Sequence, residues 1–227
     1  MSYTTLLFDV DNTILDFTRC EWEAVGLVMK NNGIEPSDEN IVYYSGVNDR
    51  FWKMFERGEI KKSEIYEGRF KAFLKEKGFN RDSKKISDEY IEALKTFHFP
   101  LDGALDMLER VSKKFEIYYT TNGNAVTQEK RIKNSGILNY AKGVFVSEAI
   151  GHQKPEKEYF DYVLENIPEK DKSRIIVIGD SMSSDILGGI NSGLDTLWFN
   201  PTGEKAIYEP TYTAKNFAEL IEILENS

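Results

Sequence analysis

The sequence predicts an α/β protein whose mostly parallel sheet is interrupted, after its first strand, by an all-helical insertion. A short apolar segment, Tyr3 to Phe8, ends abruptly at Asp9 and has the β-branched and aromatic character of a buried strand. After Pro100, segments with helical spacing alternate with short apolar runs. Strands separated by helices require right-handed crossovers, which give a parallel sheet with helices on both faces. We therefore expect a three-layer α/β core.

The insertion is predicted from an uninterrupted helical pattern between the first strand and Pro100. Apolar residues recur there at three- and four-residue spacing, and Asn32-Gly33 gives one of the helix stops. Ser87 is the expected N-cap of the last helix. We assign residues 17–99 to a helical domain and residues 1–16 and 100–227 to the α/β core. Several aromatic residues are expected mostly in the cores of these helices: Phe17, Trp22, Tyr43, Tyr44, Phe51, Trp52 and Phe55.

The second half of the chain supplies the remaining strands of the sheet. Each predicted strand is short and apolar, and each predicted helix has an apolar stripe. The expected helices are 102–113, 125–135, 155–167 and 184–191 and a C-terminal helix, and the expected strands are 115–119, 143–146, 174–178, 195–199 and a short one near Tyr212.

The composition fits a well-packed chain and argues against a nucleic acid polymer as partner. Of the 227 residues, 41% are hydrophobic, which is enough for a buried core. A net charge of −9 and a pI near 5.0 do not supply the clustered cations that a phosphate backbone needs. The lone Cys20 gives neither a disulfide framework nor a thiolate metal site. Without a signal peptide or an apolar stretch near the ~20 residues of a membrane span, we expect a cytoplasmic monomer or small homo-oligomer with no membrane association.

Polar residues follow the expected strands at the ends where parallel sheets bind their ligands. Asp9-Val10-Asp11 closes the first strand, Thr120 to Gly123 the second, and Gly179-Asp180 a later one. Lys154 lies in the segment after another strand, and Asp185 follows Asp180 within the next helix. Because parallel strands end at one edge of the sheet, folding is expected to bring these residues together.

These segments resemble the motifs of the haloacid dehalogenase (HAD) superfamily in order and in placement. Its four motifs correspond to Asp9-x-Asp11-x-Thr13, Thr121, Lys154-Pro155, and Gly179-Asp180 with Asp185. The resemblance covers nearly the whole chain and implies a Rossmann-like three-layer core with an inserted all-helical (C1) cap. It also implies a phosphatase that uses Asp9 as nucleophile, forms a phospho-aspartyl intermediate and depends on Mg²⁺.

The residue types suit this chemistry on physical grounds as well. A carboxylate nucleophile divides the slow hydrolysis of a phosphate ester into two easier steps. Its approach to a phosphate dianion is repulsive, so the site must hold cations. Mg²⁺ prefers oxygen ligands, which the carboxylates of Asp9 and Asp180 and the backbone carbonyl of Asp11 would supply. Lys154 would neutralise the nucleophile and the transferring oxygens.

Three further residues have expected roles with simpler alternatives. The Thr121 hydroxyl and the Asn122 backbone N–H would donate to phosphate oxygens, although Thr121-Asn122-Gly123 is equally good as an ordinary turn. Asp185 would orient Lys154 or a metal-bound water, or serve only as a residue of the first helical turn.

Asp11 separates phosphoryl chemistry from dehalogenation. Two residues after the nucleophile, where the chain turns, its carboxyl group can reach a leaving oxygen, donate a proton, and later activate water. Dehalogenases of the superfamily characteristically lack this second aspartate, since a halide leaves unprotonated. Its presence favours a phosphatase that acts on a small phosphorylated metabolite.

Softer patterns point to a substrate class. The segments FDVDNTILDF, Asn48 to Trp52, Gly58 to Phe70 and SEAIG are similar to the YjjG/YfnB-type pyrimidine 5′-nucleotidase branch. The resemblance implies a pyrimidine nucleoside 5′-monophosphate as substrate, with Asn48, Trp52 and Arg69 contacting the nucleoside. Each has a simpler interpretation, as a helix cap, a cap-core residue and a surface charge.

Several rival functions remain. Within the superfamily they are a sugar-phosphate or phosphoglycolate-type phosphatase, a phosphonatase and a haloacid dehalogenase. From a different class, the chain could be a catalytically silent regulatory module on the same fold. Such a module would be expected to have lost part of the motif set, and this sequence keeps all of it.

Overall fold

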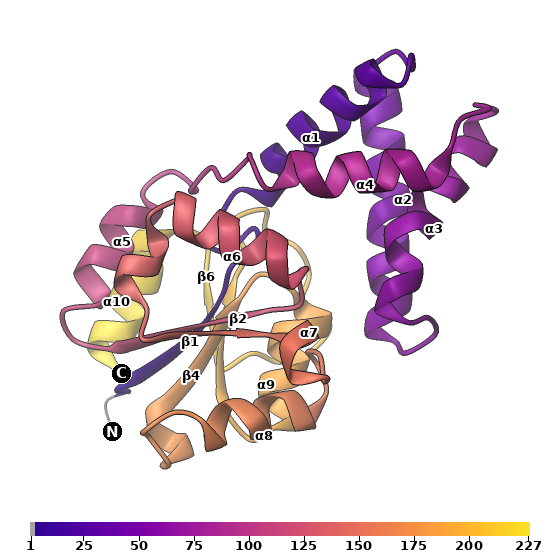
Figure 1. Cartoon of the computed structure of the whole chain (residues 1–227). Helices are drawn as coiled ribbons and strands as arrows, with labels where there is room; N and C mark the ends of the chain where they lie inside the picture. Colours follow the sequence, from indigo (N-terminus) through magenta and orange to yellow (C-terminus); the bar gives the residue numbers. More distant parts are fainter. Residues whose placement is uncertain (1–2) are drawn as a thin grey trace. The chain divides into compact units, whose positions relative to one another are not determined.

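The structure is a computed structural model that describes residues 3–227 (Figure 1). The chain divides into two compact units. The core unit consists of the residues up to Asp16 together with Phe99–Ser227, and the cap unit of Phe17–His98. The strands are β1 (Thr5–Asp9), β2 (Glu116–Thr121), β3 (Gly143–Val146), β4 (Ile175–Gly179), β5 (Asp195–Phe199) and β6 (Tyr212–Ala214).

Helices account for the rest of both units. The cap unit contains α1 (Phe17–Asn31), α2 (Asp38–Glu56), α3 (Lys62–Lys77) and α4 (Ser83–Leu94). The core unit contains α5 (Ala104–Val111), α6 (Ala125–Asn134), α7 (Ser147–Ile150), α8 (Lys157–Glu165), α9 (Leu187–Asn191) and α10 (Phe217–Asn226), and the turns η1 (Ile137–Tyr140), η2 (Lys172–Arg174) and η3 (Met182–Ile186). Among residues 3–227, no helix combines the length and the apolar character needed to cross a membrane.

The core unit is built on a 6-stranded sheet in the order β3-β2-β1-β4-β5-β6. Every neighbouring pair is parallel, which confirms the predicted α/β fold. β1 lies between β2 and β4, so the strand that ends in Asp9 has a hydrogen-bonded neighbour on each side. β2 extends to Thr121, beyond the predicted end at Tyr119, because Thr120 and Thr121 pair with the end of β3.

Apolar side chains of the sheet fill two layers, one on each face. Successive residues of a strand point to opposite faces, and β1 has apolar residues on both. Leu6 and Phe8 pack with residues of α5 and α10, while Leu7 packs with Tyr159 and Phe160 of α8. All five are fully buried. Burial of each such side chain contributes roughly 1.5–3 kcal/mol and helps to hold β1 at the centre of the sheet.

Two glycines bring α9 close to its neighbours. A Cβ atom at Gly188 would lie 2.4 Å from the ring of Phe160, and one at Gly189 would lie 2.4 Å from the side chain of Thr196. Neither distance leaves room for a methyl group. The short helix α9 therefore depends on both glycines for its contact with α8 and β5.

The predicted start of the last cap helix is wrong. Ser87 was the expected N-cap, but α4 begins at Ser83, with Asp82 as its N-cap. The Asp82 carboxylate accepts a hydrogen bond from the Lys85 amide at 3.0 Å. Ser87 lies one turn further on, where its hydroxyl donates to the carbonyl of Tyr66 at 2.8 Å. Asp and Ser are similarly good N-cap residues, and Asp82, which comes first in the chain, caps the helix.

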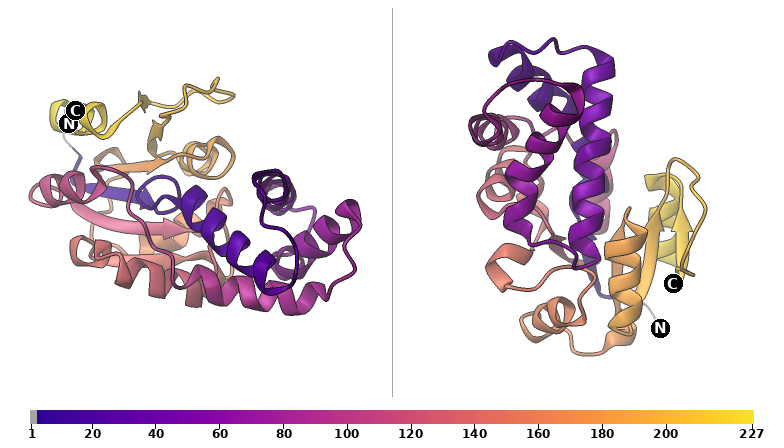
Figure 2. Two further views of the ribbon diagram at one scale, coloured as in Figure 1. Left: turned by 90° about the horizontal axis from the view of Figure 1, so that it is seen from above. Right: turned by 90° about the vertical axis from the view of Figure 1, so that its right-hand side faces the viewer.

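The cap unit contains helices only (Figure 2). Aromatic side chains pack together at its centre. Tyr44, Phe70 and Tyr90 lie within 5.8 Å of one another between ring centroids. The expectation that the cap aromatics lie mostly in the helix cores is only partly right. Tyr44 and Phe55 are buried, but Trp22 and Tyr43 are 36% and 41% exposed, because helical spacing alone does not reveal how wide the buried stripe is.

Candidate active site

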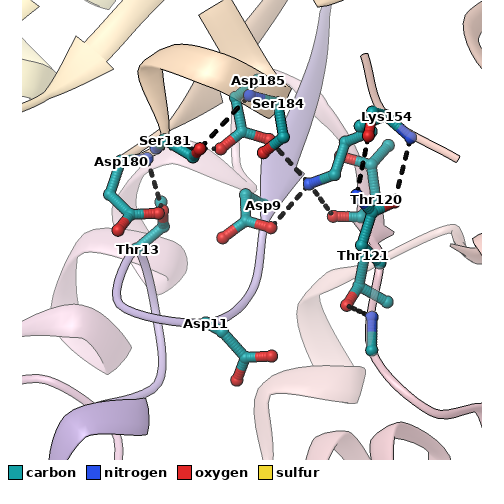
Figure 3. Close-up of polar contacts among 12 residues, drawn as sticks. Asp9, Asp11, Thr13, Thr120, Thr121, Lys154, Asp180, Ser181, Ser184 and Asp185 are labelled. Carbon is teal, nitrogen blue, oxygen red and sulfur yellow. Dashed lines mark hydrogen bonds and ion pairs between the residues drawn. The ribbon is translucent and has the colours of Figure 1, made fainter. Parts of the chain in front are cut away.

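The predicted site residues of the core unit gather at the carboxyl ends of the central strands (Figure 3). Asp9 is the last residue of β1, Thr121 the last of β2, and Asp180 follows β4 directly. Lys154 reaches the same place from the segment between α7 and α8. The convergence that was expected from the sequence is therefore present in the folded chain.

Lys154 is the buried cation of this site. Its side chain is 1% exposed, and its Nζ atom donates to Asp9 Oδ1 at 2.7 Å and to Asp185 Oδ1 at 2.6 Å. A third hydrogen bond runs to the carbonyl of Thr120 at 3.0 Å, so all three ammonium hydrogens have acceptors. Burial by itself lowers the pKa of Lys154, but the carboxylates of Asp185 and Asp9 outweigh burial and raise it above its ordinary value.

Asn122 holds the backbone of Lys154 in place. Its side-chain amide donates to the Lys154 carbonyl at 2.8 Å, and its carbonyl oxygen accepts from the Lys154 amide at 2.9 Å. The end of β2 is thereby tied to the segment that carries the lysine. The expected contact of the Asn122 backbone N–H with phosphate stays a prediction.

Asp9, Asp180 and Asp185 form a cluster of carboxylates. One oxygen from each lies within 4.8 Å of the others. Both oxygens of Asp185 are engaged, Oδ1 with Lys154 and Oδ2 with the Ser181 amide at 3.1 Å. Lys154 binds Oδ1 of Asp9, whereas Oδ2 points away from the lysine, on the side of Asp180 (Figure 3).

Asp180 is held through its backbone and through a longer hydrogen bond, at 3.5 Å, from the Thr13 hydroxyl to its Oδ1. Its amide donates to the Thr13 hydroxyl at 3.0 Å, and its carbonyl accepts from the indole N–H of Trp198 at 2.8 Å. Thr13 lies in the turn after β1, so the last residue of the first motif positions the aspartate that follows β4. This contact accounts for the threonine of the Asp9-x-Asp11-x-Thr13 pattern.

The cluster holds more negative charge than Lys154 balances. Burial raises the pKa of Asp9 to about 7, with Asp185 and Asp11 adding to the rise and Lys154 opposing it. Burial and repulsion from Asp9 and Asp185 raise the pKa of Asp180 well above its ordinary value. Both shifts mean that the site favours additional positive charge.

This arrangement fits a hard divalent cation. Every donor group in the cluster is an oxygen, which suits Mg²⁺, and a cation would relieve the carboxylate repulsion. Asp9 and Asp180 are the residues with the capacity to hold it, together with the backbone carbonyl expected from Asp11. Asp185 is occupied by Lys154 and Ser181, which matches a supporting role.

Asp11 has two partners that the sequence did not single out. Its Oδ1 accepts from Arg131 Nη1 at 2.6 Å, and its Oδ2 from Gln128 Nε2 at 2.8 Å. Gln128 Nε2 also donates to the Thr121 hydroxyl at 2.7 Å, and that hydroxyl accepts a further bond from the Gly123 amide at 3.0 Å. The one available signal was the spacing of Gln128 and Arg131, which places two polar residues on one face of a helix that follows a site strand.

The cap candidates lie in a different environment. Asn48 and Arg69 are buried inside the cap unit, at 4% and 3% exposure. Asn48 Nδ2 donates to Glu21 Oε1 at 2.5 Å, and Arg69 Nη1 donates to Asn48 Oδ1 at 2.7 Å. Trp52 is half-buried and packs edge-on against Phe55, at 5.9 Å between ring centroids. Their contact with a nucleoside stays a prediction, and Glu21, the buried partner of Asn48, was not expected.

The fold and the carboxylate–lysine site together define a family of hydrolases. Residues 6–199 match the family model of the haloacid dehalogenase-like hydrolases. The chain belongs to this family, and the protein is a hydrolase.

Three relatives match along nearly their whole length. YfnB of Bacillus subtilis, a HAD-hydrolase by name, is 41% identical over 98% of this chain and 95% of its own. Its solved structure, described as bound to magnesium, has a TM-score of 0.94 at 40% identity and covers 99% of this chain and 100% of that chain. The pyrimidine 5′-nucleotidases PynA of Streptococcus pneumoniae and YjjG of Escherichia coli are 32% and 31% identical, over 100% and 99% of this chain and 97% and 99% of theirs.

Proposed function

We propose that the protein is a Mg²⁺-dependent phosphatase that hydrolyses a small phosphate monoester through a phosphoryl intermediate on Asp9. The observation that carries this proposal is the polarised environment of the Asp9 carboxylate. Lys154 binds one oxygen at 2.7 Å, and the other points away from the lysine. A buried carboxylate held in this way is a positioned nucleophile with a cation beside the atoms that gain charge.

The reaction proceeds in two steps. In the first, an Asp9 oxygen attacks phosphorus, the bond from phosphorus to the ester oxygen breaks, and Asp11 gives its proton to the departing alcohol. In the second, water attacks the phosphorus of the acyl phosphate, Asp11 takes a proton from the water, and the Asp9 carboxylate leaves with the electron pair. The products are an alcohol and inorganic phosphate, and both aspartates regain their initial state.

Lys154 and Thr121 act on the transferring phosphoryl group. The ammonium of Lys154 offsets the charge of the nucleophile and of the phosphoryl oxygens that approach it. Thr121 already accepts two hydrogen bonds, from Gln128 and from Gly123. Its single hydrogen is therefore directed elsewhere and is available to a phosphate oxygen.

Asp9 and Asp180, with the Asp11 carbonyl, would hold Mg²⁺. The ion, when bound, supplies the positive charge that lets a phosphate dianion approach the nucleophile. The excess negative charge of the cluster supports this assignment, as does the magnesium described for the YfnB structure.

A pyrimidine nucleoside 5′-monophosphate is the proposed substrate class. Support comes from the two relatives named as pyrimidine 5′-nucleotidases, which match this chain over nearly its full length. The test is inorganic phosphate release from UMP, dUMP and dTMP, compared with ribose 5-phosphate and phosphoglycolate, each with Mg²⁺ and with EDTA. Preference for the sugar phosphate or for phosphoglycolate would replace the nucleotide assignment. No turnover of any ester with Mg²⁺ would reject the phosphatase.

The nucleophile is tested separately by Asp9→Asn. The substitution keeps the shape of the side chain and removes its nucleophilic oxygen, so turnover should fall by at least ~10⁴-fold. Acid-quenched wild-type protein should carry one phosphoryl group by mass, and the variant none. Asp161→Asn, on the surface of α8, is the matched control and should behave as wild type. Full activity in Asp9→Asn would mean that another group attacks phosphorus.

A further inference from the structure

A closed network of buried side chains links the two catalytic ends of β1 and β2. Gln128 and Arg131 are each 1% exposed and lie one turn apart on α6. Besides their bonds to Asp11, Arg131 Nη1 donates to Gln128 Oε1 at 2.8 Å. Gln128 thus contacts the acid–base candidate Asp11, the phosphate-binding candidate Thr121 and Arg131 at once.

The hydrogen bonds of this network allow only one orientation of the Gln128 side-chain amide. The Gln128 carbonyl faces the guanidinium, while its NH₂ group faces two acceptors. A flipped amide would set donor against donor at Arg131 and leave Thr121 and Asp11 without that donor. Gly123 makes room for this arrangement, since a Cβ atom there would lie 2.6 Å from Gln128 Cγ.

We propose that Gln128 and Arg131 are positioning residues that hold the Asp11 carboxyl group for proton transfer at the ester oxygen. This inference rests on the proposed function and deepens it. The two residues touch both oxygens of Asp11 but occupy only one lone-pair direction on each. The remaining directions stay open for the proton that Asp11 gives and later takes. Because Gln128 and Arg131 are buried on this face of α6, their two hydrogen bonds define the place of the Asp11 carboxylate in the turn after β1.

The position of the Asp11 carboxylate also depends on its ion pair with Arg131. The Asp11 side chain is 25% exposed and that of Arg131 is 1% exposed, with 2.6 Å between Oδ1 and Nη1. Charge-assisted hydrogen bonds of this kind are short and directional. Loss of either donor leaves Asp11 with one contact, about which its side chain can rotate.

Two phosphate esters with different leaving groups distinguish a role in positioning Asp11 from a role in stabilising the fold. Nitrophenolate departs without a proton, whereas phenolate and alkoxides benefit from an acid. We would measure kcat/KM for phenyl phosphate and 4-nitrophenyl phosphate with the wild type, Arg131→Met, Gln128→Leu and Asp11→Asn. Lys130→Met, exposed on the same helix, is the control for removal of a cation. Thermal melts show which variants are folded, and Gly123→Ala displaces Gln128 should Arg131→Met fail to fold.

Arg131→Met should lower kcat/KM for phenyl phosphate by roughly 10–100-fold and for 4-nitrophenyl phosphate by less than about threefold. Gln128→Leu also removes a hydrogen bond to Thr121, which acts on both esters, so it should lower both values and that for phenyl phosphate the more. Arg131→Lys should recover part of the loss. Equal losses on both esters, or a gain in rate, would overturn the inference while leaving the phosphatase intact. Asp11→Asn is the reference, because a flat leaving-group dependence in that variant would remove the acid role of Asp11 itself. Absence of phosphate release from either ester by the wild type with Mg²⁺ would instead defeat the proposed function.

Discussion

Replacing Lys154 by methionine tests whether this residue stabilises the carboxylate cluster as well as the reaction. Methionine keeps an unbranched side chain of similar length and loses only the ammonium group. Asp9 Oδ1 and Asp185 Oδ1 then lose donors at 2.7 Å and 2.6 Å. Because Lys154 is 1% exposed, water does not readily replace the missing hydrogen bonds.

The expected loss of stability is large. Removing one partner of a buried ion pair costs about 3–5 kcal/mol, since the other charge stays buried. For a domain of this size, each kcal/mol corresponds to ~2–4 °C in melting temperature, so the variant should melt roughly 6–20 °C lower. Lys157→Met, which removes an exposed cation paired with Asp161, should cost no more than about 1 kcal/mol.

The loss of stability in Lys154→Met should increase with pH. The pKa of Asp9 is raised to about 7, above the ~3.9 of an unfolded aspartate. The folded state therefore binds more protons between these values, and its stability falls as pH rises through that window. Lys154 opposes the rise, so without it the pKa of Asp9 moves higher and the window extends upward. The cost of the substitution should be greater at pH 8.5 than at pH 5.5.

Urea unfolding in EDTA, followed by tryptophan fluorescence, measures this cost in the core unit. The chain has three tryptophans, and replacing Trp22 and Trp52 of the cap unit by phenylalanine leaves Trp198 as the reporter. Trp198 lies in β5 and donates to the Asp180 carbonyl, close to the perturbed cluster. A loss below about 1 kcal/mol, or the same loss at both pH values, would refute the view that Lys154 balances buried carboxylates.

Three further outcomes follow from the site geometry. Thr121→Val should lower kcat/KM by roughly 10–100-fold, the value of one hydrogen bond to a charged group. It should also cost about 1–3 kcal/mol of stability, because the Gln128 amide and the Gly123 N–H lose their acceptor. Unchanged kcat/KM would remove Thr121 from phosphate binding. Gly179→Ala places a Cβ atom 2.2 Å from Asp185 Oδ2. It should destabilise the fold by ~1–3 kcal/mol in urea unfolding and reduce phosphate release. A variant with unchanged stability and activity would mean that Asp185 is free to move. Mg²⁺ at 100 times its Kd should stabilise the metal-free wild-type protein by about 2.7 kcal/mol. The same Mg²⁺ concentration should leave the stability of Asp180→Asn almost unchanged. Equal stabilisation of the two proteins in thermal melts would place the ion elsewhere.

The location of the core site was predictable because it depends only on the parallel direction of the strands. Asp9, Thr121 and Asp180 each stand at the end of an apolar run, and parallel strands bring such ends to one edge. Lys154 needed the motif resemblance, since a lysine before a proline has no local signal of burial. The prediction failed at Ser87 because two good N-cap residues lie one turn apart, and local propensity does not choose between them.

The sequence by itself determined the α/β alternation, the helical insertion and the residues that follow each strand. Only the tertiary structure decided which polar side chains meet them. Gln128 and Arg131 became partners of Asp11 because α6 packs its inner face beside the turn after β1, and helical periodicity gives a face but not its neighbour. Asn48 and Arg69 became parts of a buried network with Glu21 for the same reason. Periodicity is a local property of the backbone, whereas the pairing of buried charges depends on how distant segments pack.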